Sequence, residues 1–390
     1  MITAITSTLP MFVCLFWVML LLIDRQQMNL SKRFLVFFFS VSFVNYFSHT
    51  AYFNHQYQLY TVFDSIWCFT SLSVFPLYYL YIRLLTLDAR VKWKWALVLI
   101  PSLSVALLSA VIYLLMSPDE VQTFVHGVLY SEPGYEPPYS ALIRLQLFRM
   151  SLFKVVFVIQ VLIVIFFGLR HIMKYNARIK DFYSDTEKKD LTPIKWLLVV
   201  FIFASLVSLI SSGIGKTYFI SHDWLLFLPS VTHSLFLFGV GYAGYKQNFT
   251  IEHYQQDLNQ YELHPAGVAP LAHEKIKNED YPAQLIYLLE KDEIYKNADL
   301  RITDVAKMLH TNRTYTSRLM HDVFQSNFAD FINKYRVKKS EELIRNDIEN
   351  EYSLEDIATL SGFSSESSFY RSFKKEKGTT PGEFRKGLKK

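Results

Sequence analysis

The chain has 390 residues, of which 51% are hydrophobic and only 19% are charged. Its 33 phenylalanines and 25 tyrosines are more than an ordinary soluble protein of this length contains, which argues against a wholly soluble chain. The formal net charge of +5 is too small to indicate nucleic-acid binding by itself. The two cysteines, Cys14 and Cys68, lie in apolar runs, so the sequence suggests neither a disulfide framework nor a metal site.

Seven apolar stretches occupy residues 1–245, and each is close to the roughly 20 residues that a helix needs to cross a bilayer. They are Ile5–Ile23, Phe34–Phe53, Tyr60–Leu84, Trp95–Met116, Met150–Leu169, Trp196–Lys216 and Trp224–Tyr245. The first stretch lacks the basic leader and the cleavage site of a signal peptide, so we expect it to be retained as a helix. The sequence therefore predicts an all-α protein that begins with a bundle of seven transmembrane helices.

Basic residues are concentrated in alternate loops of this predicted bundle. Fourteen lysines and arginines lie in or at the edges of the connections that follow the first, third and fifth stretches, whereas the other side has only Arg144, Arg149 and Lys216. The positive-inside rule then places the N-terminus outside and the chain from Lys246 onward in the cytoplasm. We therefore expect a multi-pass protein of the inner (cytoplasmic) membrane, with the lipid bilayer as one of its partners.

Polar and charged side chains inside the predicted spans are costly in hydrocarbon and therefore mark candidate functional sites. Asp64 on the third span and Lys154 on the fifth lie at a similar depth, about one helical turn from the outer surface. Further polar residues lie near the outer ends of the second and sixth spans. The predicted sensor cluster consists of Asn45, His49, Asp64, Lys154, Ser211 and Ser212. Two interpretations stay open, a structural Asp64–Lys154 ion pair and a pocket for a small-molecule ligand.

Two polar segments are predicted to be connections rather than sites. The outer loop Ser117–Gln146 holds acidic residues and His126, but their spacing matches no metal-ligand pattern, so we predict neither a metal nor a cofactor. Residues 246–280 contain two prolines and a glycine that would break a long helix, and we interpret them as a cytoplasmic linker. The apolar string in this linker is too short to establish a homodimer, which stays an open alternative.

Residues 281–390 carry two copies of a helix-turn-helix pattern, and the second copy is the clearer. Ser353 and Asp356 predict a capped helix start, and Gly362 can take the positive φ that a tight turn between two helices needs. On the next helix, Phe369 and Phe373 share one face. The opposite face shows hydroxyl and basic side chains, namely Ser367, Tyr370, Arg371, Lys374 and Lys375. Such a helix can pack on a core and enter a DNA major groove.

The second copy resembles the second helix-turn-helix of the AraC/XylS family of transcription regulators. The resemblance is carried by motifs in register: Gly362-Phe363-Ser364-Ser365, Ser367-x-Phe369-x-Arg371-x-Phe373-Lys374-Lys375 and Gly378-x-Thr380-Pro381. It covers about residues 281–390, where a first helix-turn-helix is expected near Leu300–Met320 and a connecting helix from Phe328. This first motif departs from the family pattern at three positions, where glycine, leucine and glycine are usual: His310, Thr316 and Gln325. The departures predict a less stable first motif.

The resemblance also implies a set of DNA-contacting residues. Base-edge contacts are carried over to Thr314, Ser317, Arg318, Ser367, Tyr370 and Arg371, and Lys374 and Lys375 complete the predicted DNA-binding set. Two recognition helices held by one connecting helix would enter successive major grooves about 34 Å apart on one DNA face. The implied partners are double-stranded DNA and the transcription machinery.

The sequence thus predicts a non-enzymatic, membrane-embedded transcription regulator. Residues 1–245 would sense a signal or serve as an anchor, and residues 281–390 would bind promoter DNA. In one alternative, proteolysis in the linker releases the regulator from its membrane anchor. In the other, the membrane half is a transporter or an intramembrane enzyme with an autoregulatory DNA-binding domain. The latter predicts an inverted repeat or paired ionisable residues along a full transmembrane path, and the sequence has neither.

Overall fold

The computed structural model describes residues 2–24, 28–88, 90–187, 189, 191–215, 218–219, 222–263, 280–347, 349 and 351–388. The chain divides into two compact units. The apolar unit comprises Met1–Met173 and Leu191–Glu252, and the C-terminal unit comprises Lys174–Asp190 and His253–Lys390. The described residues form helices and no strand, apart from an isolated bridge between Tyr183 and Arg301, which confirms the predicted all-α class.

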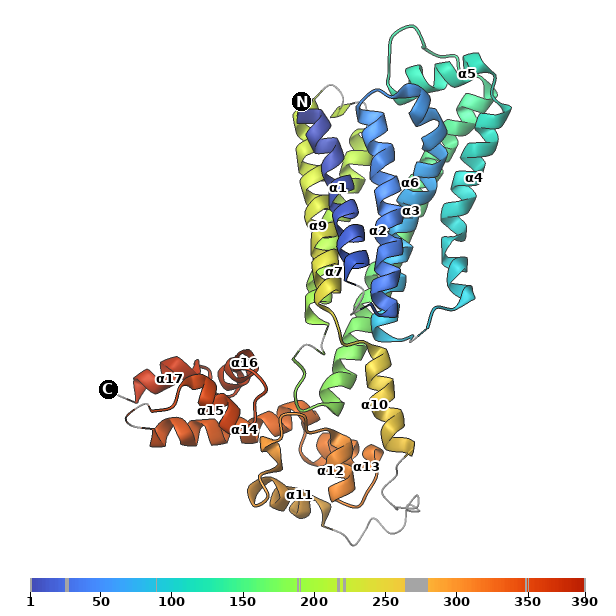
Figure 1. Cartoon of the computed structure of the whole chain (residues 1–390). Helices are drawn as coiled ribbons and strands as arrows, with labels where there is room; N and C mark the ends of the chain where they lie inside the picture. The colour runs from blue at the N-terminus through green and yellow to red at the C-terminus, as the bar shows by residue number, and fades with distance from the viewer. Residues whose placement is uncertain are drawn as a thin grey trace. The chain divides into compact units, whose positions relative to one another are not determined.

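The apolar unit is built from long helices that run side by side (Figure 1). They are α1 (Ile2–Ile23), α2 (Leu30–Phe53), α3 (Tyr57–Thr86), α4 (Ile100–Leu115, preceded by η2, Trp93–Leu99), α6 (Ala141–Phe182), α7 (Thr192–Ile214) and α9 (Phe227–Lys246, preceded by η4, Asp223–Leu226). Two short helices, α5 (Pro118–Gln122) and η3 (Thr123–Leu129), follow α4. Among the described residues, seven helices are long and apolar enough to cross a membrane, and they correspond to the seven predicted stretches.

Helix α6 is longer than its predicted span of Met150–Leu169. It runs without interruption for 42 residues, because no proline occurs between Pro138 and Pro193. Its first turns therefore bring Arg149 into the helix, although the sequence prediction places this residue on the outer side, directly before the span. Its residues from Lys174 onward belong to the C-terminal unit.

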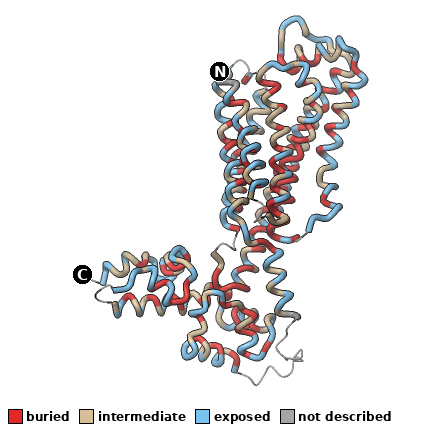
Figure 2. The backbone as a smooth tube through the Cα atoms, viewed as in Figure 1, coloured by how far each residue is buried: buried red, intermediate tan, exposed pale blue. Residues whose placement is uncertain are grey.

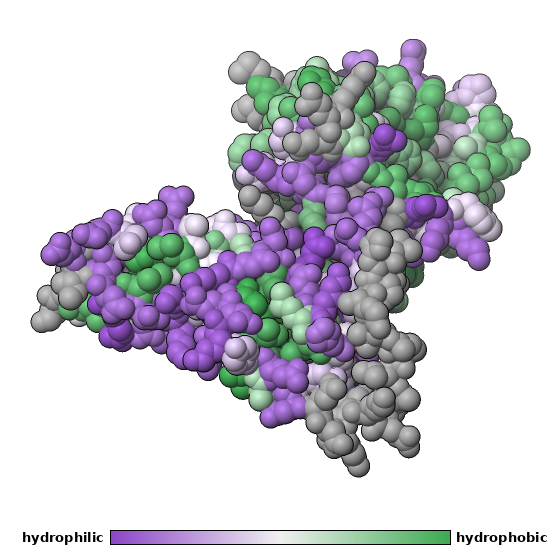
Figure 3. Space-filling view, turned by 60° about the horizontal axis from the view of Figure 1, so that its bottom comes forward, coloured by the Kyte–Doolittle hydropathy of each residue, from purple (hydrophilic) through white to green (hydrophobic). Residues whose placement is uncertain are grey.

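The helices of the apolar unit pack closely inside and expose apolar side chains outside. At Gly241 on α9, an added Cβ would lie 2.3 Å from the ring of Trp17, so the glycine allows α9 to approach α1. Figure 2 shows the buried residues along the inner sides of the helices. The outer sides carry large hydrophobic residues such as Leu114 and Phe166, which are 85% and 61% exposed. Hydrophobic residues gather over this unit in Figure 3. A surface of this kind suits hydrocarbon rather than water.

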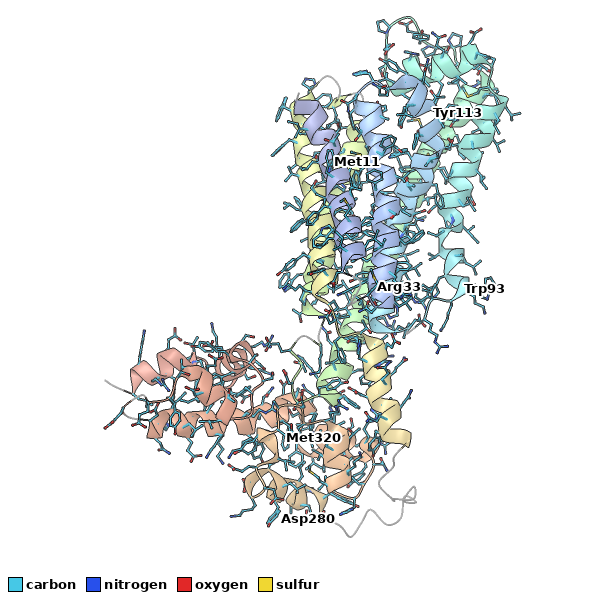
Figure 4. All side chains as sticks on the ribbon, in the orientation of Figure 1. Met11, Arg33, Trp93, Tyr113, Asp280 and Met320 are labelled. Atoms are coloured by element: carbon cyan, nitrogen blue, oxygen red, sulfur yellow. The ribbon has the colours of Figure 1, made fainter. Side chains whose placement is uncertain are left out.

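The C-terminal unit contains shorter helices around a core of its own. They are α10 (Ile251–Leu263), α11 (Tyr281–Glu290), η6 (Ile294–Lys296), α12 (Ile302–Met308), α13 (Arg313–Arg318), η7 (Leu319–Val323), α14 (Phe328–Asn346), α15 (Leu354–Leu360), α16 (Glu366–Lys377) and α17 (Pro381–Gly387). Asp280, labelled in Figure 4, caps α11 by accepting a hydrogen bond from the Ala283 amide at 3.2 Å. The predicted linker thus contains one helix of 13 residues, α10, whereas its helix-breaking residues Pro265, Gly267 and Pro270 lie outside the described residues.

Candidate nucleic-acid interface and ligand pocket

Helices α15 and α16 form the second helix-turn-helix, with the capped start and glycine turn that the sequence predicts. The Ser353 hydroxyl accepts from the Asp356 amide at 3.0 Å, and the Asp356 carboxylate accepts from the Ser353 amide at 2.9 Å. In the turn, Gly362 has a φ of +89°, and an added Cβ would lie 2.5 Å from the carbonyl oxygen of Tyr295. Only glycine fits this position without a steric overlap.

The two faces of α16 separate core contacts from candidate DNA contacts. Phe369 and Phe373 are fully buried, and they pack with Phe363 and Phe384 in the core that α14, α15 and α16 share. The opposite side exposes Ser367, Arg371, Lys374 and Lys375, and Tyr370 is half-buried. Ser365 caps the start of the helix, and Gly378 ends it with a φ of +75°. The helix can therefore present its polar face while its aromatic face holds it in place.

The first helix-turn-helix is formed by α12 and α13. Asn312 caps α13 by accepting from the Tyr315 amide at 2.9 Å. Of the predicted contact residues, Thr314 and Arg318 are exposed and Ser317 is half-buried. These three residues and those of α16 thus lie on two separate short helices of the C-terminal unit.

The departures from the family pattern have visible consequences in the first motif. His310 and Gln325 both have a φ of +50°, a conformation that glycine adopts without strain and other residues adopt at a cost of about 1–2 kcal/mol. Thr316 is completely buried where a leucine is usual, and its hydroxyl donates to the Asn312 carbonyl at 3.1 Å. The lower stability of this motif stays a prediction.

Arg336 on α14 joins the parts of the C-terminal unit. Its guanidinium is almost fully buried and donates to the carbonyls of Tyr295 and Asn297, both at 2.8 Å, and to the hydroxyl of Ser184 at 2.9 Å. Burial lowers the pKa of Arg336 to about 10. Sequence reasoning missed this role, because an arginine on a predicted connecting helix has no signal that distinguishes a buried tie from a solvated charge.

The segment Tyr183–Glu187 also belongs to this unit, although the sequence had placed it in a loop after the fifth span. The Glu187 carboxylate accepts hydrogen bonds from Ser365 and, at 2.5 Å, from Ser367, and the Asp185 carboxylate accepts one from Ser364. Ser367, a predicted base-contact residue, therefore has an acidic partner within the chain. No local sequence pattern links residues that are 180 positions apart.

In the apolar unit, one cavity of about 350 Å³ brings the predicted sensor cluster together. All six members, namely Asn45, His49, Asp64, Lys154, Ser211 and Ser212, line it from four helices. Most of the remaining wall is apolar and aromatic, with residues such as Trp67, Phe153, Phe157, Phe201 and Phe236. Its size and its combination of apolar wall and few polar groups are typical of small-molecule sites.

The ionic partner of Asp64 is Arg149, so the predicted Asp64–Lys154 pair is wrong. The Asp64 carboxylate accepts from the Arg149 guanidinium at 2.8 Å and from the hydroxyls of Tyr60 and Tyr113, both at 3.1 Å. Tyr113 is labelled on α4 in Figure 4. Arg149 takes this place because α6 begins nine residues before Met150, at Ala141, which brings the guanidinium into the bundle. Within the described part of the chain, Lys154 has no acidic partner.

Other polar groups around the cavity differ in their hydrogen bonding. His49 accepts from the indole of Trp67 at 3.0 Å, and His233 bonds to Ser208 at 2.7 Å. The amide oxygen of Asn45 and the hydroxyl of Ser205 are buried and have no hydrogen-bond partner within the described part of the chain. Among the described residues, no group of histidine, cysteine and acidic side chains could hold a metal ion.

The C-terminal unit has the geometry of a helix-turn-helix DNA-binding domain. Comparison with known proteins leads to the same class of domain. Residues 305–387 match the protein family described as "Helix-turn-helix domain". These residues therefore form a helix-turn-helix domain. No solved structure matches the chain.

Three relatives each match part of the chain. The "Msm operon regulatory protein" of Streptococcus mutans serotype c (strain ATCC 700610 / UA159) is 27% identical over 119 residues, which cover 30% of this chain and 42% of that protein. The "Uncharacterized HTH-type transcriptional regulator YtdP" of Bacillus subtilis (strain 168) is 28% identical over 88 residues, 23% of this chain and 11% of that protein. The "Probable transcription factor PqrA" of Proteus vulgaris is 28% identical over 93 residues, 24% of this chain and 74% of that protein. The chain thus spans less than half the length of the first two.

Proposed function

We propose that this protein is a membrane-embedded transcription regulator that binds promoter DNA through its two helix-turn-helix motifs. The observation that carries the proposal is the construction of α16. This helix is anchored by the buried Phe369 and Phe373 and exposes Arg371 and Lys374 on its other side. A recognition helix needs this arrangement, because its base-contacting side chains must be held in register by a rigid core. The names of the three relatives support the regulatory role.

The membrane part of the proposal is supported by the apolar unit. The seven long apolar helices found among its described residues and its large exposed hydrophobic side chains fit a bilayer, and the loop charges favour a C-terminal unit in the cytoplasm. DNA would then be bound at the inner face of the membrane. Contacts with the transcription machinery and a homodimer on DNA are further parts of the proposal.

The signal part of the proposal is supported by the cavity of the apolar unit. A plain anchor needs no cavity of about 350 Å³ lined by charged and polar side chains, and such groups are costly inside spans. We therefore assign the cavity as the site where a small-molecule signal binds. Release by proteolysis and a transporter with an autoregulatory domain are the competing hypotheses.

Enrichment of DNA by the intact protein tests the proposal. The full chain in lipid nanodiscs is incubated with a random duplex library, and bound duplexes are sequenced over several rounds. We expect enrichment of a motif with two half-sites about one helical turn apart, since two recognition helices would enter successive major grooves. Enrichment no greater than that of empty nanodiscs would refute DNA binding. A regulator active only as a cleaved soluble fragment would support the proteolysis hypothesis instead.

A further inference from the structure

We propose that the cavity of the apolar unit takes an amphipathic anion, with the ammonium group of Lys154 as its counter-charge. This inference rests on the proposed function in taking the cavity as the signal site, but binding to it is measured without DNA. Apart from its histidines, three ionisable side chains line the cavity, namely Asp64, Arg149 and Lys154. Asp64 and Arg149 neutralise each other at 2.8 Å, whereas Lys154, an exposed residue that also lines the cavity, has no acidic partner among the described residues. A ligand with one negative charge would compensate its charge.

The other residues that line the cavity indicate the chemistry of the uncharged part of the ligand. Aromatic side chains such as Phe153, Phe157, Phe201 and Phe236 surround the cavity and favour an apolar or aromatic body. The buried oxygens of Asn45 and Ser205, which have no partner among the residues that the structure describes, would gain hydrogen bonds from a ligand. The volume of about 350 Å³ limits the ligand to a small molecule. The chemistry is that of a carboxylate or similar anion on a short apolar or aromatic skeleton.

Three soluble probes of one shape test the charge preference. The full chain in nanodiscs is titrated with 4-phenylbutyrate, 4-phenylbutanol and 4-phenylbutylamine, and binding is measured by ligand-observed NMR and by the shift in Tm. We expect the carboxylate to bind about tenfold more tightly than the alcohol, and the amine to bind least. Lys154→Met should remove the advantage of the carboxylate and Lys154→Arg should keep it. Arg170→Met, which removes a positive charge from α6 outside the cavity lining, should leave binding unchanged.

Two results would overturn this inference. One is an amine that binds as well as the carboxylate, and the other is a Lys154→Met protein that keeps the full preference for the carboxylate. Neither result depends on whether the protein binds DNA, so the failure of the ligand class is distinguishable from a failure of the proposed function.

A different observation carries a second inference. We infer that the segment Tyr183–Glu187 is an autoinhibitory element that competes with DNA for the start of α16. The segment is built into the C-terminal unit by several hydrogen bonds. The Ser184 amide donates to the Leu300 carbonyl at 3.0 Å, and the Ser184 hydroxyl donates to the Ala298 carbonyl and accepts from Arg336. Ser184 is fully buried, so the segment is part of the packed unit.

The two carboxylates of the segment form hydrogen bonds with hydroxyl groups that would otherwise be available to contact DNA. Asp185 and Glu187 accept hydrogen bonds from Ser364, Ser365 and Ser367 at the N-terminal end of α16. A helix N-terminus attracts anions, and the first residues of a recognition helix are those that meet base edges and phosphates. A DNA phosphate backbone cannot approach while two carboxylates hold this position, because like charges would lie side by side and Ser367 is already engaged.

The position of the segment in the chain connects it to the proposed signal site. Tyr183 directly follows Phe182, the last residue of α6, and the same helix carries Arg149 and Lys154 of the cavity. The inference rests on the proposed function, since an inhibitor of DNA binding requires that DNA is bound.

Removal of the two carboxylates tests this inference. Asp185→Asn/Glu187→Gln is compared with Glu290→Gln/Asp292→Asn, which removes the same charge from exposed positions of the C-terminal unit. Both are made in the full chain in nanodiscs, and affinity for the duplex enriched by the wild-type protein is measured by fluorescence anisotropy. We expect the first variant to bind about tenfold more tightly than the wild type and the control to change less than about twofold.

A reversible cross-link provides the converse measurement. Asp185→Cys and Ser364→Cys are joined with a short cleavable bis-methanethiosulfonate reagent, while the natural Cys14 and Cys68 are both buried. We expect DNA binding to be lost on cross-linking and regained on reduction. Equal DNA affinity of the carboxylate variant, the control and the wild type would overturn the autoinhibitory role, as would full binding by the cross-linked protein. If no variant binds any duplex, the proposed function fails and this inference fails with it.

Discussion

The guanidinium of Arg149 donates a 2.8 Å hydrogen bond to the carboxylate of Asp64, and both side chains are about 2% exposed. The pair lies on α6 and α3 and is completed by the hydroxyls of Tyr60 and Tyr113. Two charges that satisfy each other in this way can be accommodated between helices, whereas one alone is expensive. The pair is thus a structural element of the cavity. Because Asp64 is paired with Arg149, Lys154 is available to interact with a ligand.

We predict that Asp64→Asn and Arg149→Met each destabilise the apolar unit by about 3–5 kcal/mol, because each leaves an unmatched buried charge. The double variant should recover much of this loss, since no lone charge remains. Lys154→Met is the matched control and should cost little, as Lys154 has no acidic partner among the described residues. The stability of the two single variants, the double variant and the control is measured by thermal unfolding in nanodiscs and by abundance in the membrane. Destabilisation by Lys154→Met as large as that of Arg149→Met would contradict the observed pairing.

A topology series tests the proposed membrane orientation. We expect reporter fusions after Arg33, Arg90 and Lys246 to report the cytoplasm, and fusions near Gln56 and Glu132 to report the exterior, as the loop charges predict. The side of each fusion point is measured with two reporters, one active only in the cytoplasm and one active only outside, and the expression level of each fusion serves as the control. One fusion on the wrong side would refute the arrangement of seven spans.

Sequence specificity should depend on α16 in a way that separates base contacts from phosphate contacts. We predict that Arg371→Ala weakens specific binding by about 1–3 kcal/mol and relaxes the preference at one or two base pairs, because arginine can make a bidentate contact to guanine. Lys386→Ala, at an exposed basic position of α17, should weaken all duplexes about equally and reduce the salt slope by about 1. Competition mobility shifts at several salt concentrations measure both. An unchanged operator preference in Arg371→Ala would mean that α16 does not read bases.

The sequence predicted those features that depend on neighbouring residues. The seven apolar stretches, the Ser353–Asp356 cap and the glycine turn at Gly362 are all local patterns, and the structure confirms each of them. Helix lengths were less predictable, because the polar ends of α6 continue a helix that hydropathy alone would end near Leu169.

The features that the sequence did not predict depend on contacts between distant residues. The depth of a residue in a membrane span can be predicted from its number, but the side of the helix on which it meets a partner cannot. The sequence therefore suggests Lys154 as the partner of Asp64, whereas the structure shows that the partner is Arg149. The contacts of Glu187 with Ser365 and Ser367 and the burial of Arg336 arise only when the unit is assembled. These interactions belong to the candidate sites, where tertiary context decides which polar groups meet.

The last prediction uses two glycines of the second helix-turn-helix that share a positive φ but differ in their surroundings. At Gly362, with a φ of +89°, an added Cβ would lie 2.5 Å from the Tyr295 carbonyl oxygen and 2.6 Å from the Cα of Lys296. At Gly378, with a φ of +75°, nothing lies within 4 Å of the added atom. Gly378→Ala should therefore cost only the strain of the left-handed conformation, about 1–2 kcal/mol. Gly362→Ala adds a backbone overlap and should cost about 2–5 kcal/mol in total.

Hydrogen–deuterium exchange of the full chain measures this difference in the C-terminal unit. We expect Gly362→Ala to reduce the protection of α15 and α16 strongly and to abolish specific DNA binding, because the two helices can no longer meet at the turn. Gly378→Ala should leave DNA binding close to that of the wild type. Exchange in the helices of the apolar unit, which contains neither glycine, serves as the internal reference. Equal loss of protection in the two variants would show that φ strain, and not the approach of the Tyr295 backbone, makes glycine necessary at position 362.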